Sequence, residues 1–159
     1  MLDVQCFNIF HTFAALINEH ILSMVYLTRR ETFNAAHKLW VDEWSEEKNR
    51  AVFGKCANAN WHGHNYSLYV TVKGQPDPYT GFVMDAKKLS ILIKDNVTNL
   101  LDHQNLNLDV DFIPKNMQPT TENLAIVIWK QIEQKLEGCR LHCIKLVETE
   151  NIYAEYFGE

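Results

Sequence analysis

The chain has 159 residues, enough for one domain that buries about 70% of its unfolded surface. Its 47% hydrophobic and 22% charged residues are typical of a soluble globular protein. The formal net charge of −5 argues against nucleic-acid binding, which usually requires a basic surface. The cysteines, Cys6, Cys56, Cys139 and Cys143, fit neither a disulfide framework nor paired CxxC zinc motifs, so a reducing cytoplasm is expected.

Residues 1–23 differ from the rest of the chain. Their apolar residues are interrupted too often to span a bilayer, which needs about 20 consecutive, mostly apolar residues. The segment also lacks the basic start of a signal peptide. Two interpretations stay open: a short amphipathic helix, or an upstream extension of a product that begins at Met24. No function is assigned to this segment.

From Val25 onward, hydrophobic periodicity predicts a series of strands and helices. The expected elements are, in chain order, strands over 25–34, 67–73 and 82–84, a helix over 87–101, a loop over 109–119, a helix from Thr120 or Thr121 to near Gly138, and strands over 141–148 and 153–157. Because the helices are grouped instead of alternating with strands, this order favours an α+β fold with an antiparallel sheet.

Three histidines have the spacing of metal ligands. His62 and His64 lie two residues apart in an extended segment, with Cα atoms about 6.6 Å apart and side chains on one face. Gly63 between them leaves room, and His37 ends the first strand, which a neighbouring strand could bring to the same point. Three histidines and one open position describe a catalytic zinc site. Two alternatives stay open: an ordinary surface histidine pair, or a closed structural site with Cys56 as fourth ligand.

Cys56 and the Asp102–His103 pair are further candidates for chemistry. Cys56 lies in a loop, and a thiol near a metal and a basic side chain can have a pKa below about 8.5. It could therefore act as a nucleophile, a base or a ligand. Asp102 and His103 directly follow the first predicted helix and could relay protons for a thiolate. The alternative for His103 is capping of the helix C-terminus.

Five motifs occur in order from about Met24 to the C-terminus: FNAAH, FGKCxNxNxHGHNY, LDHxNLN, PTTENLAxxIW and VETEN. Together they resemble the 6-pyruvoyl-tetrahydropterin synthase family, which includes the 6-carboxytetrahydropterin synthases of queuosine biosynthesis. The resemblance implies a catalytic domain over 24–159 with the tunnelling fold (T-fold), an antiparallel four-stranded sheet with two helices on one face. It also implies a homohexamer of two trimers whose subunits join edge to edge.

The resemblance also implies a role for each candidate residue. The three histidines would bind Zn²⁺, and Cys56 would be the base that removes carbon-bound protons from the substrate. Asp102 and His103 would complete its proton relay. Glu148 would anchor the pterin ring, and the remaining pocket residues would be Thr120, Thr121 and Glu122. The resemblance does not identify the charge that holds the triphosphate, for which the candidates are Lys38, Arg29 or a neighbouring subunit.

The implied reaction converts 7,8-dihydroneopterin triphosphate to 6-pyruvoyltetrahydropterin with elimination of triphosphate. The enzyme would be a zinc-dependent carbon–oxygen lyase of tetrahydrobiopterin biosynthesis. Five residues separate Cys56 from His62, and this spacing favours the pyruvoyl branch over the carboxy branch, which releases acetaldehyde. Trp61 departs from the small or aliphatic residue that often precedes HGH in this family.

Overall fold

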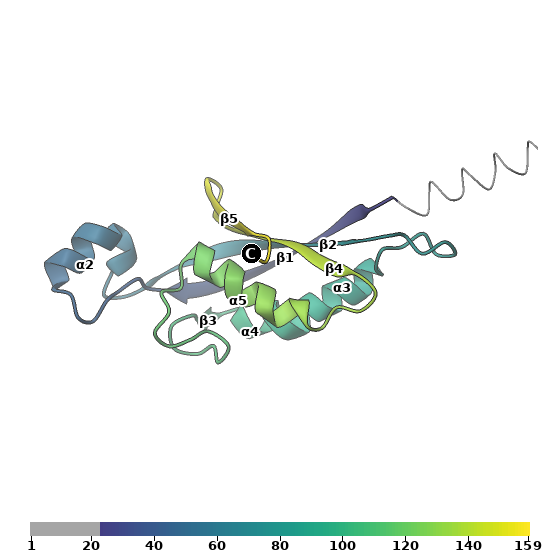
Figure 1. The fold of residues 1–159 in the computed structure, drawn as a ribbon. Helices are drawn as coiled ribbons and strands as arrows, with labels where there is room; N and C mark the ends of the chain where they lie inside the picture. Colours follow the sequence, from purple (N-terminus) through teal and green to yellow (C-terminus); the bar gives the residue numbers. More distant parts are fainter. Residues whose placement is uncertain (1–22) are drawn as a thin grey trace, which may run out of the picture.

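The computed structural model describes residues 23–159, a twisted sheet with helices on one face (Figure 1). Both interpretations of the N-terminal segment therefore concern residues that lie almost entirely outside the described range. The elements are, in chain order, β1 (Val25–His37), α2 (Glu46–Phe53), the 3₁₀ turn η1 (Gly54–Ala57), β2 (His62–Gly74), α3 (Ala86–Ile93), the π-helical turn η2 (Lys94–Thr98), α4 (Asn99–Leu101), β3 (Gln104–Asn105), α5 (Thr121–Glu133), β4 (Arg140–Thr149) and β5 (Ile152–Tyr156).

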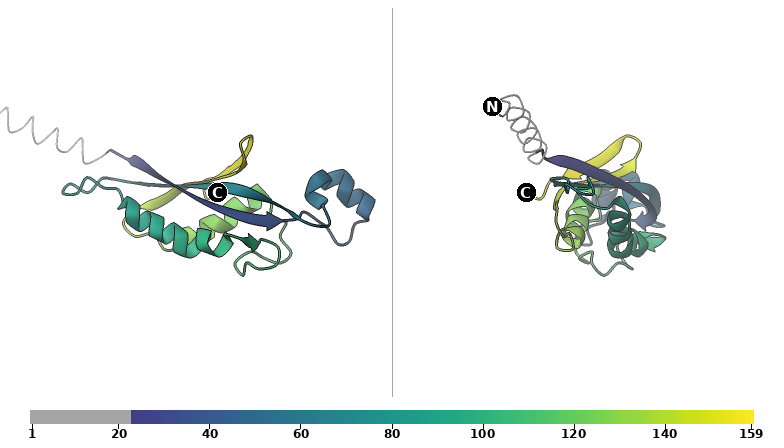
Figure 2. Two further views of the ribbon diagram at one scale, coloured as in Figure 1. Left: turned by 180° about the vertical axis from the view of Figure 1, so that it is seen from behind. Right: turned by 90° about the vertical axis from the view of Figure 1, so that its right-hand side faces the viewer.

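The sheet has the strand order β3-β1-β2-β4-β5, and the pairs β1–β2, β2–β4 and β4–β5 are antiparallel. Helices α3, α4 and α5 cover one face and leave the other open (Figure 2). The expected α+β fold is confirmed, with five strands instead of four. The extra strand, β3, is two residues long and pairs in parallel with β1 because the chain leaving α4 turns back along that edge.

The segment 82–84, expected to be a strand, is a loop, and that prediction was wrong. The Asp77 N–H donates to the Phe82 carbonyl at 2.9 Å, and the Gly81 N–H donates to the Asp77 carbonyl at 2.8 Å. Gly81 has a φ of 72°, a left-handed conformation that glycine adopts without strain. These bonds close a turn over 77–82. The apolar residues 82–84 follow this turn directly and do not pair with a strand.

The helices match the predicted positions, with differences at their ends. Helices α3 and α4 form one run over the predicted range, interrupted by η2. Helix α5 has Thr120 as its N-cap, whose side chain accepts from the Asn123 N–H, and ends at Glu133, before Gly138. Helix α2 was not predicted, although Ser45 caps it by accepting from the Lys48 N–H at 3.2 Å.

The hydrophobic core lies between the sheet and the helices, and it fixes which way each strand residue points. Side chains at alternate positions of the two central strands face the helices and are buried, among them Phe33, Tyr66, Leu68 and Val70. The same alternation directs the three histidines to the helix-covered face, just beyond the core. None of the helices within residues 23–159 is long and apolar enough to cross a membrane.

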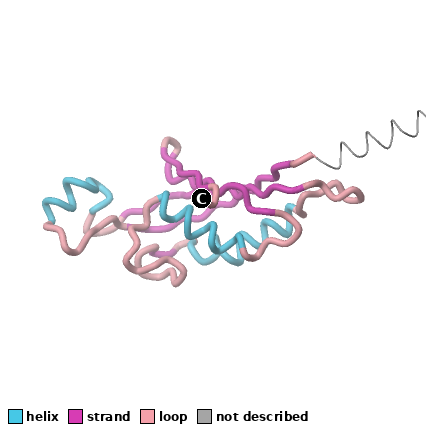
Figure 3. The backbone as a smooth tube through the Cα atoms, in the orientation of Figure 1, coloured by secondary structure: helices cyan, strands magenta, loops and turns pink. Residues whose placement is uncertain are grey.

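The loop between β3 and α5 runs beside the end of β1 (Figure 3). The Leu106 N–H donates to the Ala36 carbonyl at 2.9 Å, and side chains farther along the loop bond the backbone after His37. Helix α2 lies beyond this end of the sheet (Figure 1). The two segments therefore border the region where the predicted site residues lie.

Candidate metal centre

Four side chains converge where β1, β2 and β4 meet. The strand register places His37 opposite His62, while His64 lies two residues farther along β2 on the same face. Strand β4, on the other side of β2, contributes Glu148 near its end. One ring nitrogen from each histidine and one carboxylate oxygen of Glu148 all lie within 4.8 Å of one another. This group, His37, His62, His64 and Glu148, is called the four-residue centre below.

His37 is held in one tautomer. Its Nδ1 lies 2.9 Å from the Pro119 carbonyl oxygen, and because a carbonyl only accepts, Nδ1 must carry the proton. In the neutral imidazole, the lone pair of Nε2 then faces the centre, 3.0 Å from Nε2 of His62. Two nitrogens on one tetrahedral metal at 2.0–2.1 Å are about 3.3 Å apart, so this spacing is close to that of a metal-bound pair.

The unpaired Nε2 of His64 is a second observation that fits a metal site. This nitrogen is buried and has no hydrogen-bond partner among the described residues. The nearest carboxylate oxygen, Oε1 of Glu148, is 3.0 Å away but does not meet hydrogen-bond geometry. A buried nitrogen without a partner is unfavourable, and a metal ion bound to its lone pair would satisfy it. The residues present therefore fit a divalent metal with nitrogen and oxygen ligands.

Glu148 is the negative charge of the centre. Its Oε2 accepts a hydrogen bond from the Thr121 hydroxyl at 2.5 Å, and its Oε1 lies 3.4 Å from Nε2 of His37. The contact with His37 lowers the pKa of Glu148 to about 2, with further lowering from Thr121 and His64, although burial acts in the opposite direction. The carboxylate is thus ionised at neutral pH and can accept from a cation or from N–H groups.

The pKa values of His62 and His64 are lowered from the ordinary histidine value, chiefly by burial. For His62, repulsion from the neighbouring imidazoles adds to this effect. Neutral imidazole is the form that binds a metal. Both side chains are therefore in the metal-binding form at neutral pH.

Metal affinity is expected to depend on pH in a defined direction. Because lowered pKa values keep these imidazoles neutral, the metal Kd should change little between about pH 8 and pH 7 and should rise steeply as the pH falls below about 6. Competition with a chromophoric chelator at each pH measures this. A tenfold loss of affinity between pH 8 and pH 7 would contradict it.

Cys56 lies close to the centre but outside it. It belongs to η1, and its carbonyl accepts from the Leu39 N–H at 2.9 Å, which ties this turn to the chain after β1. Burial raises the pKa of the Cys56 thiol, and the charge of Glu148 raises it further. The lowering expected from the sequence concerns a thiol beside a metal ion and a basic side chain, and it stays a prediction. The fourth member of the centre is Glu148 and not Cys56, so the geometry gives no support to a closed site of one cysteine and three histidines.

The Asp102–His103 pair is formed as predicted. Nδ1 of His103 lies 2.9 Å from Oδ2 of Asp102, and the other oxygen of Asp102 accepts from the Asn34 N–H at 2.8 Å. This backbone bond, followed by the contact with His103, lowers the pKa of Asp102. The bond between the two side chains directs the His103 ring to Asp102 instead of to a helix carbonyl.

The structure does not bring this pair to Cys56 within one chain. The His103 side chain is 78% exposed and lines a cleft of about 500 Å³ together with Asn34, Gly63 and Asn65. Asn34 and Asn65 are paired across the strands and alternate with the positions that face the helices. The pair thus lies at the β1 edge of the sheet, in a cleft that His64 also lines.

The other predicted pocket residues differ in how close they lie to the centre. Thr121 contacts Glu148 directly, whereas Thr120 caps α5 and Glu122 is exposed in its first turn. Arg29 pairs with Glu31 at 2.7 Å and precedes His37 by eight residues, about 26 Å along the strand, so it cannot reach the centre of its own chain.

Lys38 follows His37 directly, and its Nζ lies 4.2 Å from the centre of the Trp40 ring and 6.0 Å from that of Trp61. Trp61 itself has a φ of 67°, an uncommon value for a residue with a side chain. These residues line a cleft of about 810 Å³ beside the centre, with the loop residues Lys115 and Gln118 on the other side.

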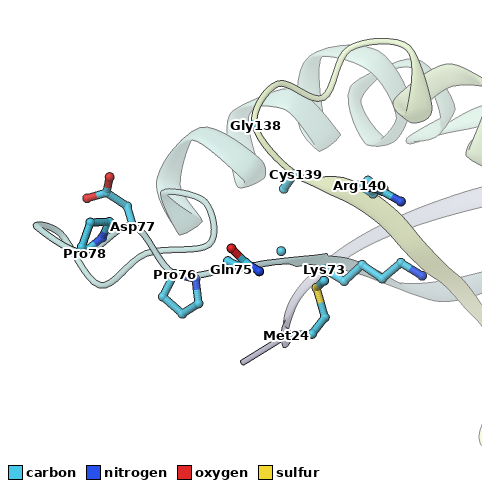
Figure 4. Close-up of a pocket in the computed structure, with 10 residues that line it drawn as sticks. Met24, Lys73, Gln75, Pro76, Asp77, Pro78, Gly138, Cys139 and Arg140 are labelled. Atoms are coloured by element: carbon cyan, nitrogen blue, oxygen red, sulfur yellow. The ribbon is translucent and has the colours of Figure 1, made fainter. Parts of the chain in front are cut away.

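Another cleft, of about 760 Å³, lies at the opposite end of β2 (Figure 4). Its lining includes Lys73 and Arg140, which are paired across β2 and β4, and Cys139. None of the predicted site residues lies there.

Comparison with known families agrees with this geometry. The sequence profile of the family described as 6-pyruvoyl tetrahydropterin synthase matches residues 26–159, which include the whole sheet from Tyr26 onward and all four residues of the centre. The chain belongs to the 6-pyruvoyl tetrahydropterin synthase family. It is therefore a lyase of that family, and the tunnelling fold implied by its motifs is confirmed.

Relatives cover nearly the whole matched region. A 6-pyruvoyl tetrahydrobiopterin synthase of Dictyostelium discoideum is 43% identical over 135 residues, which cover 85% of this chain and 97% of that protein. The structure of the Caenorhabditis elegans 6-pyruvoyl tetrahydropterin synthase has a TM-score of 0.80 at 35% identity and covers 86% of this chain and 97% of its own. A dihydroneopterin monophosphate aldolase of Pyrococcus furiosus is 38% identical over 109 residues, which are 69% of this chain and 75% of that protein.

Tyr66 is a residue of the site that the sequence analysis did not single out. It is 1% exposed, its ring lies 5.7 Å from that of His64, and its hydroxyl has no hydrogen-bond partner among the described residues. Burial raises the pKa of Tyr66, and the charge of Glu148 raises it further, so the hydroxyl keeps its proton. Its position two residues after His64, on the same strand face, was the signal available in the HGHNY motif.

Tyr66→Phe is expected to leave the free energy of unfolding unchanged or to raise it by about 1 kcal/mol, because the change removes a buried polar group that lacks a partner. Denaturant unfolding of the metal-free protein measures this. Phe33→Leu, in the ring that stacks on Tyr66 at 4.9 Å, serves as a packing control and should be destabilising. If Tyr66→Phe lowers the free energy of unfolding by more than about 1 kcal/mol, the hydroxyl must have a hydrogen-bond partner in the folded protein.

Proposed function

We propose that this chain is a zinc-dependent lyase that converts 7,8-dihydroneopterin triphosphate to 6-pyruvoyltetrahydropterin with elimination of triphosphate. The observation that carries the proposal is the four-residue centre, in which three histidine nitrogens and one carboxylate lie within 4.8 Å of one another. Histidine nitrogens with one further position suit zinc in catalytic sites. Membership of the 6-pyruvoyl tetrahydropterin synthase family supports the same substrate class.

His37, His62 and His64 would hold the zinc ion, which supplies Lewis-acid stabilisation of negative charge on the substrate side chain. Glu148 would bind the pterin ring, because its ionised carboxylate can accept two adjacent N–H groups at once. The Thr121 hydroxyl, 2.5 Å from Oε2, would keep that carboxylate oriented.

Cys56 would act as the base. Its thiolate takes a proton from a side-chain carbon, the electrons of that C–H bond form a C=C bond, and the C–O bond to triphosphate breaks. The enol left by this elimination becomes one ketone by tautomerisation, without a redox change. The other ketone forms by two-electron oxidation of the remaining alcohol carbon, which the two-electron reduction of the dihydropterin ring balances, so no external oxidant is needed. Burial and Glu148 raise the pKa of the Cys56 thiol, and a metal ion held by the histidines would act in the opposite direction and help to form the thiolate.

The Asp102–His103 pair would return protons, and a homohexamer of two trimers would bring it to the thiol. Two observations support this assembly. The pair is exposed beside the edge of β1 and does not reach Cys56 in its own chain. In addition, β3 pairs with only two residues of β1, and β5 has no neighbour on its outer side in the described chain, so both sheet edges are open for pairing with other copies.

The proposal includes a catalytic domain over 24–159 and a cytoplasmic location, and it gives residues 1–23 no role. Cys56, Cys139 and Cys143 are free thiols, as expected in a reducing compartment.

The test is product analysis with 7,8-dihydroneopterin triphosphate before and after treatment with a chelator. We expect triphosphate and 6-pyruvoyltetrahydropterin in equal amounts, loss of both after chelation, and recovery when zinc is added. Acetaldehyde with 6-carboxytetrahydropterin would instead assign the carboxy branch. Turnover that survives complete removal of metal would overturn the zinc dependence.

A further inference from the structure

Three of the four residues after β1 are held by side-chain amides instead of by a neighbouring strand, and the fourth, Leu39, donates to the Cys56 carbonyl. Asn107 accepts from the Lys38 N–H and donates to the Lys38 carbonyl, both at 3.0 Å. Gln118 makes the same exchange with Trp40, at 3.0 Å and 2.6 Å. Asn49 makes it with Val41, at 2.8 Å and 2.9 Å. Each amide imitates the pair of bonds that a strand residue would make.

One of these three amides is connected to the metal centre. Gln118 precedes Pro119, whose carbonyl oxygen lies 2.9 Å from Nδ1 of His37. Trp40, which Gln118 holds, follows His37 by three residues. The bonds thus close a ring that runs from His37 through the backbone to Trp40, across the Gln118 amide to Pro119, and back to the His37 imidazole.

The same residue also fixes the start of α5. The Gln118 carbonyl accepts from the Thr120 N–H at 2.8 Å and from the Asn123 side chain at 2.9 Å. Thr121, the next residue, donates to Glu148. Gln118 therefore lies at the junction of two segments, one bonded to His37 and one bonded to Glu148.

We propose that Gln118 is a positioning residue for the metal ligand His37, acting through the Pro119 carbonyl. With this carbonyl fixed, the proton stays on Nδ1 and the Nε2 lone pair points into the centre. Without the amide exchange, the Pro119 carbonyl can move away from the ring. The imidazole is then free to rotate or to change tautomer, and metal binding must reorder it. The inference rests on the proposed metal site but not on the proposed reaction.

Asn107 provides a matched control. Its amide makes the same two bonds to Lys38, the residue next to His37, but its own neighbours in the chain make no bond to a residue of the centre. Loss of either amide removes two side-chain hydrogen bonds to the backbone of the same segment. A purely structural role predicts similar effects for both, whereas a positioning role predicts an effect on metal binding for Gln118 alone.

The experiment compares Gln118→Met with Asn107→Leu in the full-length chain, using zinc as the probe. Zinc Kd is measured by chelator competition, and the Tm of the metal-free protein is measured alongside. We expect both changes to lower Tm by similar amounts, Gln118→Met to raise the zinc Kd about 10- to 100-fold, and Asn107→Leu to change it less than about threefold. His62→Ala defines complete loss of the site.

Equal effects of the two variants on zinc Kd, or an unchanged Kd in Gln118→Met, would overturn the positioning role. If Gln118→Met does not fold, Gln118→Glu replaces it, because the carboxylate keeps the bond from the Trp40 N–H and loses only the donor to the Trp40 carbonyl. Zinc bound without turnover of the pterin substrate would refute the proposed reaction and leave this inference intact. Failure of the unaltered chain to bind zinc would refute both.

Discussion

Cys56→Ala is expected to lower kcat/KM for triphosphate release by at least about a thousandfold, because the variant has no base beside the substrate side chain. The fold and the bound metal should both be retained. Cys56 is partly exposed in η1 and lies outside the four-residue centre, so its thiol supports neither the core nor the metal. Steady-state kinetics, together with metal content per chain, measures the two effects.

His62→Ala is the matched variant for Cys56→Ala. It removes a side chain of the centre and should lose both metal and activity. Full activity in Cys56→Ala would end the assignment of the thiol as a base. If Cys56→Ala loses the metal while its fold stays intact, the sulfur is a metal ligand. This result would support the alternative of a closed structural site.

Glu148→Gln is expected to reduce kcat/KM at least about a hundredfold while metal content stays at that of the unaltered chain. The amide keeps one acceptor but replaces the other with a donor, which would face a donor on the pterin ring. The loss should appear mainly in KM if Glu148 anchors the ring. Kinetics and metal analysis on one preparation distinguish an anchor from a fourth ligand, since loss of a ligand would lower metal content.

Thr121→Val is the control for Glu148→Gln. It removes the hydrogen bond to Oε2 without changing the charge of the carboxylate, so activity should fall only about tenfold. The pKa of Glu148 should rise from about 2 because one of the contacts that lower it is lost. If Thr121→Val lowers kcat/KM as much as Glu148→Gln does, the orientation of the Glu148 carboxylate matters more for activity than its charge.

Several parts of the fold follow from local patterns. Alternation predicted β1, β2, β4 and β5 because a strand directs successive side chains to opposite faces whatever it pairs with. Apolar spacing predicted α5, and the threonine before it predicted the N-cap. The segment 82–84 has a strand-like composition but lacks a partner, and pairing depends on residues distant in the sequence.

Helix α2 and β3 escaped prediction for different reasons. Helix α2 is short and polar, with only Asn49 buried, so it shows no hydrophobic stripe. Its signal was Ser45 followed by two acidic residues in the first turn. Strand β3 has only two residues, too few for any alternation to be read, and exists because its backbone meets the edge of β1.

The sequence by itself predicted which residues gather at the candidate metal centre. His62 and His64 share a face because they are two residues apart in a strand, His37 was predicted to join them from the end of the first strand, and the family motifs added Glu148 as the pterin anchor. Only the tertiary structure decided how these groups meet. It placed Glu148 within the histidine cluster, raised the pKa of Cys56, separated Asp102–His103 from it, and connected Gln118 to His37. Distances and pKa values of this kind depend on strand register and burial, which residues far apart in the chain set together.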